Sequence, residues 1–130
     1  MVAMLLLDSH VVLWVLGDNP RLGAQARAAI SVDSPVHVSA ASVFELTLKA
    51  MLNKLTLPDD FERMLAGQGF AFLAITTSHA HALRRFPDMV GRDPFDQLLM
   101  AQASVEGMQL LTADRVLLAT GHPFVVDATR

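Results

Sequence analysis

The sequence predicts an α/β fold in which a mostly parallel sheet is covered by helices on both faces. Short apolar stretches alternate along the chain with segments in which apolar residues recur at helical spacing. Acidic residues directly follow several of these stretches, where the strands of such a sheet would end. The length of 130 residues suits one domain with a buried core, so we treat residues 1–130 as a single domain.

The N-terminal part begins with a predicted buried strand at residues 4–7, MLLL. A helix over 10–17 is expected to end at Gly17, because Asn19 and Pro20 follow it. Further along, Ser39 is predicted to cap a long helix of helically spaced apolar residues. The elements expected in this part are helices over 10–17, 21–30 and 39–52, strands over 4–7 and 36–38, and a loop over 31–35.

The C-terminal part contains the stretch RDPFDQLLMAQA, residues 92–103, which begins a helix predicted to run to Glu106. Asp93 is predicted to be its N-cap and Pro94 its first helical residue, where a missing N–H costs nothing. Asp96 in the third position is also favoured by the helix dipole, although Glu or Gln is usual there. The other elements expected are helices over 58–66 and 78–86, a loop over 87–92, strands over 70–75, 109–111 and 124–126, and a short helix after 112.

The composition limits the classes of function. Hydrophobic residues make up 52% of the chain and the mean hydropathy is +0.39, so we expect a partner or a second copy to cover some apolar surface. The net charge of −3 argues against coating nucleic acid by charge alone. The absence of cysteine excludes disulfides and thiolate metal sites, and it is compatible with a cytoplasmic location. No apolar run is long enough for a membrane span, and MVAMLLL lacks the basic start of a signal peptide.

Four acidic residues occupy corresponding places in this alternating pattern. Asp8 and Asp114 follow predicted strands, whereas Glu45 and Asp96 lie early in predicted helices. Each has a structural alternative: Asp8 as a helix cap, Asp114 as a partner of a helix dipole, and Glu45 as an ion-pair partner of Lys49. These alternatives do not explain why all four would be directed toward one crevice of a doubly wound sheet.

A cluster of carboxylates needs protons or cations. Two carboxylates about 4 Å apart repel by about 4 kcal/mol at an effective dielectric constant near 20. Because the chain offers no thiolate and no evident set of histidine ligands, oxygen ligands favour Mg²⁺ or Mn²⁺ over zinc. Such ions activate water for phosphodiester hydrolysis.

Four blocks of the sequence, in order, carry a resemblance to a known family. They are LLLDSHVVLW, SAASVFELTLK, RDPFDQLLMAQA and LLTADRVLLATG. With them the chain resembles the PIN-domain nucleases, and among these the VapC-type ribonuclease toxins of toxin–antitoxin pairs. The resemblance implies a three-layer α/β/α fold, a divalent-metal site, and cleavage of RNA that a cognate antitoxin restrains. It also favours a homodimer.

The resemblance places Asp8, Glu45, Asp96 and Asp114 on the family's acidic quartet. Of these, Asp8, Asp96 and Asp114 are expected to be direct metal ligands, and Glu45 to bind the metal directly or through water. Thr112 falls on the family's strand-end Ser/Thr, which is expected to hold Asp114 or a metal-bound water.

Two departures from the family pattern keep an alternative open. Relatives with this DPFD block often have a histidine and an arginine where this chain has Gly91 and Gln97. The alternative is a catalytically weak PIN-like module that binds RNA or protein. A receiver-like phosphoacceptor domain is disfavoured, because no adjacent pair of acids follows the first strand.

Other residues receive a structural interpretation first. His79 and His81 are spaced i,i+2, which directs two helical side chains apart, so we expect structural roles for them. Trp14 and Phe44 are expected in the core rather than stacked on bases. The remaining candidates for contact with RNA or a partner are Arg84, Arg85 and Arg92, whose alternative is a solvated helix end.

Overall fold

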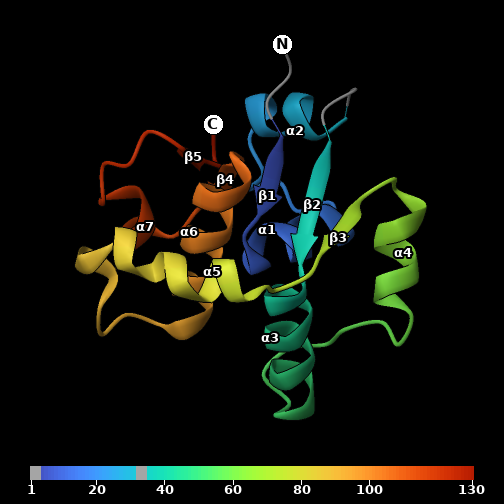
Figure 1. Ribbon diagram of the computed structural model, residues 1–130. Helices are drawn as coiled ribbons and strands as arrows, with labels where there is room; N and C mark the ends of the chain where they lie inside the picture. The colour runs from blue at the N-terminus through green and yellow to red at the C-terminus, as the bar shows by residue number, and fades with distance from the viewer. Residues whose placement is uncertain (1–3, 32–34) are drawn as a thin grey trace.

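The structure is a computed structural model that describes residues 4–31 and 35–130, and these residues form a parallel five-stranded sheet between helices (Figure 1). The α/β prediction and its three-layer form are confirmed. The strands are β1 (Leu5–Leu7), β2 (Val36–Ser39), β3 (Ala71–Leu73), β4 (Gln109–Thr112) and β5 (Val125–Asp127). The helices are α1 (Ser9–Leu16), α2 (Ala24–Ser31), α3 (Ala40–Met51), α4 (Phe61–Gly67), α5 (Thr77–His81), α6 (Pro94–Glu106) and α7 (Arg115–Leu118), with 3₁₀ turns η1 (Ala82–Arg85) and η2 (Pro87–Met89).

The strand order is β3-β2-β1-β4-β5, so β1 lies at the centre of the sheet. From β1 the chain continues to β2 and β3 on one side, and it later returns to place β4 and β5 on the other side. The order therefore reverses between β1 and β4. In open α/β sheets, ligands bind outside the carboxyl ends of the strands at such a reversal.

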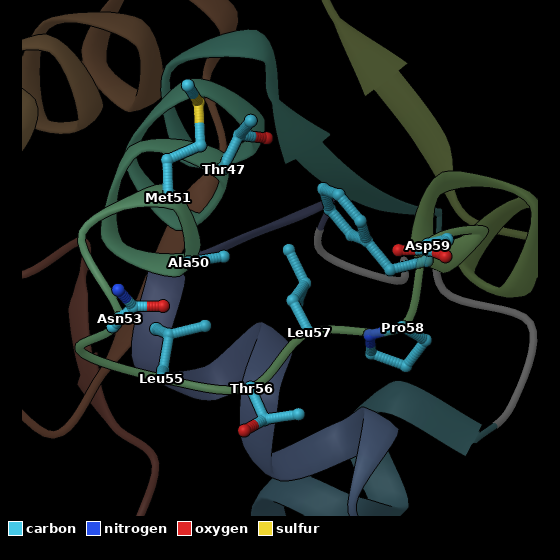
Figure 2. A pocket seen from close by; sticks show the side chains of 10 residues that line it. Thr47, Ala50, Met51, Asn53, Leu55, Thr56, Leu57, Pro58 and Asp59 are labelled. Carbon is cyan, nitrogen blue, oxygen red and sulfur yellow. The ribbon is translucent and has the colours of Figure 1, made fainter.

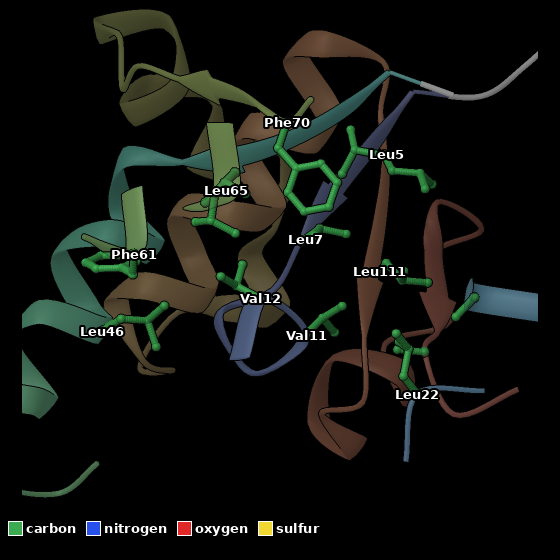
Figure 3. Close-up of a cluster of buried hydrophobic side chains, with 14 residues drawn as sticks. Leu5, Leu7, Val11, Val12, Leu22, Leu46, Phe61, Leu65, Phe70 and Leu111 are labelled. Carbon is green, nitrogen blue, oxygen red and sulfur yellow. The ribbon is translucent and has the colours of Figure 1, made fainter. Parts of the chain in front are cut away.

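Alternating leucines of β1 supply two cores on opposite faces of the sheet. Leu5 and Leu7 pack into one cluster together with residues of α1, α3 and α4 (Figure 3). Leu6 packs into a second cluster, which contains Leu99 of α6 and Leu117 of α7. Because successive strand residues point to opposite faces, an uninterrupted apolar strand is expected wherever helices cover both sides.

Three predicted helices differ from the observed ones, and the helix predicted over 58–66 begins only at Phe61 as α4. The helix predicted over 21–30 begins only at Ala24, and the N–H of Gly23 just before it bonds to the carbonyl of Ala128 at 2.9 Å. A Cβ at Gly23 would overlap the backbone of Arg130, so glycine is required where the chain passes its C-terminal segment. Neither contact has a local sequence signal.

The helix predicted over 78–86 is divided into the short α5 and the turn η1. It ends at Phe86, whose φ of −127° and ψ of 67° are not helical, because the following Pro87 disfavours helical backbone there. Part of the loop predicted over 31–35 lies outside the described residues. No helix in the described part of the chain has the length and apolar character needed to cross a bilayer.

Candidate functional site

Asp8 lies at the carboxyl end of β1 and is fixed by both of its carboxylate oxygens. It is buried, and Oδ1 accepts the Ser9 N–H at 2.7 Å, which caps α1. Oδ2 accepts the Thr112 hydroxyl at 2.6 Å. Since Thr112 is the last residue of β4, this bond joins the two strands between which the sheet order reverses.

Thr112 also orients the next acid along the chain. Its Oγ1 accepts the Asp114 N–H at 3.0 Å, so the expectation that Thr112 holds Asp114 agrees with the structure. The hydrogen bond from Thr112 to Asp8 is an addition that the sequence did not predict. Asp114 is the N-cap of α7, and its Oδ1 accepts N–H bonds from Val116 at 2.7 Å and Leu117 at 3.2 Å. Within the described chain, Oδ2 of Asp114 has no hydrogen-bond partner.

Glu45 lies in the second turn of α3, and it is also held at both oxygens. The buried Ser9 hydroxyl donates to Oε1 at 2.6 Å, and the Lys49 ammonium lies 3.0 Å from Oε2. The ion pair expected from the i,i+4 spacing is therefore present. Ser39, whose Oγ accepts the Ala41 N–H at 3.0 Å, caps α3, so no capping box links Ser42 to Glu45.

Asp93 and Asp96 take different positions at the start of α6. Asp93 is the N-cap, and its Oδ1 accepts N–H bonds from Phe95 at 2.8 Å and from Asp96 at 3.4 Å. The cap prediction for Asp93 is confirmed. The Asp96 carboxylate, in contrast, has no hydrogen bond or ion pair to any residue that the structure describes.

The other acids lie close enough to Asp96 to affect its protonation. Partial burial, as the largest cause, and the negative charges of Asp8, Asp114, Asp93 and Glu45 together raise the pKa of Asp96 to about 7. Burial also raises the pKa of Asp8, while the hydrogen bond from Thr112 acts in the opposite direction. Asp8, Glu45, Asp96 and Asp114 thus lie near one another at the place where an open α/β sheet has its ligand crevice, called the acidic crevice below, and Asp96 is the member without a partner.

The donor set fits a hard divalent cation, because every candidate ligand is a carboxylate oxygen and the chain has no thiolate. The unpartnered Asp96 carboxylate, with its raised pKa, lacks the positive charge that such an ion would supply. The acids do not form a closed cage, however. Over residues 4–31 and 35–130, no three His, Cys, Asp or Glu side chains are grouped closely enough to hold a metal ion as they stand.

In the described part of the chain, the three candidate arginines form no hydrogen bond or ion pair with any of the four acids. Arg84 contacts His81 at 3.1 Å and Arg85 donates to Ser104 at 2.9 Å, both on exposed surface. Arg92 lines a hollow of about 480 Å³ together with Arg115. None of the three predicted arginines forms a salt bridge with another described residue.

The structural role expected for His79 agrees with the structure. It is buried in α5, its Nδ1 accepts the Thr76 N–H at 3.0 Å, and its Nε2 lies 2.7 Å from Glu106 Oε2. The contact with Glu106 connects α5 with the end of α6. The His79 ring therefore has a structural role, and its hydrogen-bond partners include none of the four acids of the quartet.

Ser9 is a candidate positioning residue that sequence analysis did not identify. A serine after an aspartate at a strand end resembles an ordinary helix start, and its partner Glu45 lies 36 positions away.

The prediction that Phe44 lies in the core is wrong, because its side chain is 63% exposed. Trp14, by contrast, packs against the core as predicted.

A separate hollow of about 460 Å³ lies at the far end of α3 (Figure 2). Met51 and Ala50 of α3 border it, and Leu55 and Leu57 face it from the segment that leads to α4. None of the four acids lines it. It is therefore a different surface from the acidic crevice.

Solved structures with the same fold come from toxin–antitoxin systems. The TM-score is 0.66 for a toxin–antitoxin complex from Klebsiella pneumoniae, at 17% identity over 93% of this chain and 94% of that one. It is 0.66 for VapBC2 from Rickettsia felis bound to a DNA fragment from its promoter, at 11% identity over 95% and 96%. It is 0.65 for DNA-bound VapBC from Salmonella typhimurium, at 16% identity over 96% of each chain. At these identities the similarity concerns the fold.

Two sequence comparisons place the chain in a family. It is 33% identical over 120 residues to the Mycobacterium tuberculosis protein named Ribonuclease VapC22. The matched region covers 91% of this chain and 92% of that protein. The PIN domain family matches residues 5–123, a range that includes all four acids and Thr112. The protein belongs to the PIN domain family.

Proposed function

We propose that the protein is a metal-dependent endoribonuclease that acts as the toxin of a toxin–antitoxin pair. The observation that carries the proposal is the convergence of four carboxylates at the reversal of strand order, with Asp96 left without a partner. The 33% identity to a protein named as a ribonuclease supports the choice of RNA as substrate. A cysteine-free chain that acts on RNA is expected in the cytoplasm.

Asp8, Asp96 and Asp114 are the proposed metal ligands, and Glu45 would bind the ion directly or through water. When bound, Mg²⁺ or Mn²⁺ supplies a Lewis acid that activates water and stabilises the departing oxygen. The attacking water oxygen forms a bond to phosphorus as the bond from phosphorus to the departing ribose oxygen breaks. At neutral pH the Asp96 carboxylate holds a proton part of the time, so a proton competes with a cation for this site.

Residues around the acids position them for this reaction. Thr112 restricts the Asp8 carboxylate through its hydroxyl, and Ser9 does the same for Glu45. Lys49 balances part of the negative charge of the cluster through Glu45 Oε2. Because the four acids do not close around an ion as they stand, we expect Asp96, which has no partner to lose, to make the largest side-chain movement on metal binding.

The test is cleavage of a mixture of cellular RNAs by the purified protein with Mg²⁺ or Mn²⁺. We expect internal cleavage that stops in EDTA and in Asp8→Asn, with the circular dichroism spectrum of the variant unchanged. Equal cleavage by EDTA-treated protein would refute the metal-dependent reaction.

A second candidate is a catalytically weak PIN-like module that binds RNA or protein. Gln97 favours it, because its side chain donates to the Met89 carbonyl at 2.9 Å and is therefore engaged in holding η2 against α6 rather than in contact with substrate. Gly91 has a φ of +84°, which favours glycine over the histidine of relatives. Calorimetric titration with Mn²⁺ separates the two candidates: absence of binding at millimolar Mn²⁺ would favour the module.

We also propose a cognate antitoxin and a homodimer as partners. Support comes from large apolar side chains exposed on α3, which are Leu48 and Met51, and from Leu52 at its end. Light scattering is expected to give twice the mass of the chain. Copurification of a small protein encoded by the adjacent reading frame would support the antitoxin, whereas a lone monomer at micromolar concentration would contradict both partners.

A further inference from the structure

Two phenylalanines form an exposed aromatic pair beside the acidic crevice. Phe44 of α3 is 63% exposed, and its ring centroid lies 5.9 Å from that of Phe95, with an angle of 35° between the ring planes. Phe95 is partly buried at the start of α6. The pair therefore consists of an outer ring open to solvent and an inner ring that supports it.

The position of the pair relates it to the proposed chemistry. Phe44 immediately precedes Glu45, and Phe95 immediately precedes Asp96. Neighbouring residues of a helix differ by only about 1.5 Å along its axis and by about 100° around it, so each ring lies level with the neighbouring acid on an adjoining face of the helix. The same two helices thus bring together two acids and, one residue earlier on each, the two rings.

We propose that Phe44, supported by Phe95, stacks on a nucleobase of single-stranded RNA next to the phosphodiester at the acidic crevice. This inference rests on the proposed function and adds the part of the substrate that the acids do not bind. Single-strand binders commonly stack bases on aromatic side chains, and the contact tolerates any base because each has a π-face. Because the net charge of −3 argues against binding RNA by charge alone, a stacking contact would add a non-ionic contribution.

Phe72 provides a matched control with the same side chain. It is 44% exposed and lies on β3, the edge strand that β2 separates from β1. Phe72→Ala therefore removes an exposed aromatic ring that belongs to neither α3 nor α6.

The test measures fluorescence anisotropy of an end-labelled single-stranded RNA of about ten nucleotides, a length in the range that single-strand sites occupy. The parent protein carries Asp96→Asn so that the probe stays intact, and gels of the same samples record any hydrolysis. We expect Phe44→Ala and Phe44→Leu to weaken binding about tenfold, and Phe44→Trp and Phe72→Ala to stay within about twofold. Unchanged binding by a folded Phe44→Ala variant would overturn the proposal.

Probes with one abasic nucleotide identify a base as the partner of Phe44. At one position of the probe, loss of the base should weaken binding to the parent about tenfold but should not weaken binding to Phe44→Ala further. Equal effects in both proteins would mean that Phe44 contacts something else. A change in mass by light scattering, without a change in RNA binding, would assign the ring pair to a protein interface and overturn the proposal.

These outcomes separate this inference from the proposed function. If the parent binds RNA with the expected Phe44 dependence but the wild type cleaves none, the nuclease proposal fails and the stacking contact stands. If the wild type cleaves RNA and Phe44→Ala binds normally, only the stacking contact fails. Absence of any binding of the probe by the parent would overturn the stacking contact.

Discussion

Asp93 and Asp96 lie three positions apart at one helix end, and their surroundings separate their roles. Asp93 uses its carboxylate to satisfy N–H groups that every helix start leaves without partners. Asp96 has no such bond, and its neighbours are other acids. A carboxylate that is partly buried among negative charges destabilises the fold when it ionises, which is a cost that a cation would offset.

The pKa of Asp96 predicts how stability depends on pH. Its value of about 7 in the folded protein exceeds the ordinary 3.8, so the folded state binds the proton more tightly than the unfolded state. The stabilisation is complete below about pH 4 and is lost as the pH rises through 7. Without metal, Asp96→Asn should therefore be more stable than wild type at pH 8, by about 1–2 kcal/mol after allowance for solvent screening.

Urea unfolding in EDTA at a series of pH values measures this effect. The advantage of Asp96→Asn should shrink toward zero as the pH falls to 4, because wild-type Asp96 is then protonated and uncharged. An advantage of the same size at pH 4 and pH 8 would mean that ionisation of Asp96 is not its cause.

Thr112 has a comparably specific role, because one hydroxyl serves two of the acids. Thr112→Val keeps the shape but removes the donor to Asp8 and the acceptor for the Asp114 N–H. We expect it to lower the free energy of unfolding by about 1–3 kcal/mol, since buried groups lose their partners. Thr112→Ser, which retains the hydroxyl, should lose less than half of this in the same urea titration, and equal losses would indicate that the methyl group matters instead.

Residue-scale prediction from sequence succeeded where the partner is local. The Asp93 cap and the Glu45–Lys49 pair depend on neighbours two to four positions away. The bonds from Ser9 to Glu45 and from Thr112 to Asp8 span 36 and 104 positions, so only the fold creates them. Exposure of Phe44 likewise depends on how α3 lies against α6, which helical spacing does not show.

At the scale of elements, α6 is fixed at both ends. Asp93 caps its start, and Gly107 ends it with a left-handed φ of +67°, while Glu106 bonds to His79 of α5. A helix held in this way keeps Asp96 at a defined place beside β1. The cap and the glycine are predictable from sequence, whereas the contact between His79 and Glu106, which spans 27 positions, is not.

Gly107→Ala tests the end of α6, and Gly67→Ala in α4 is its control. The first should lower the free energy of unfolding, whereas the second should not. Gly107→Ala places a Cβ in a left-handed conformation and should lower the free energy of unfolding by about 1 kcal/mol. Gly67→Ala in α4 meets no atom within 4 Å at its Cβ and has no positive φ, so it should be neutral or stabilising by up to about 1 kcal/mol. Thermal unfolding of both variants provides the measurement, and equal destabilisation would exclude the φ of Gly107 as the cause.

At the scale of the whole molecule, sequence pattern was sufficient for the fold class because the strands are short and mostly apolar and each strand before β5 is followed by a helix. The strand order was not specified by that pattern. The order places β1 between β2 and β4, and it is this placement that brings acids from both ends of the chain to one crevice. The quartet was predicted from the place of each acid in the alternating pattern and from the family resemblance, whereas the hydrogen bonds from Ser9 to Glu45 and from Thr112 to Asp8 came only from the fold.

Binding of a divalent ion by acids from distant parts of the chain should stabilise the whole fold. A ligand that binds only the folded state at a hundred times its dissociation constant adds about 2.7 kcal/mol. We therefore expect Mn²⁺ to raise the thermal midpoint of the wild type by several degrees and to have little effect on Asp8→Asn or Asp114→Asn. Equal rises in wild type and variants would place the ion elsewhere.

The central claim, that the acids of the crevice perform metal-dependent cleavage of RNA, is tested most directly by comparing Asp96→Asn with Asp93→Asn in one cleavage assay with Mg²⁺. Both variants replace an aspartate by asparagine in the same turn, and asparagine is itself a good N-cap. We predict that Asp96→Asn lowers the rate by at least about a hundredfold, whereas Asp93→Asn stays within about tenfold of the wild type. Cleavage by Asp96→Asn at the wild-type rate would contradict the assignment.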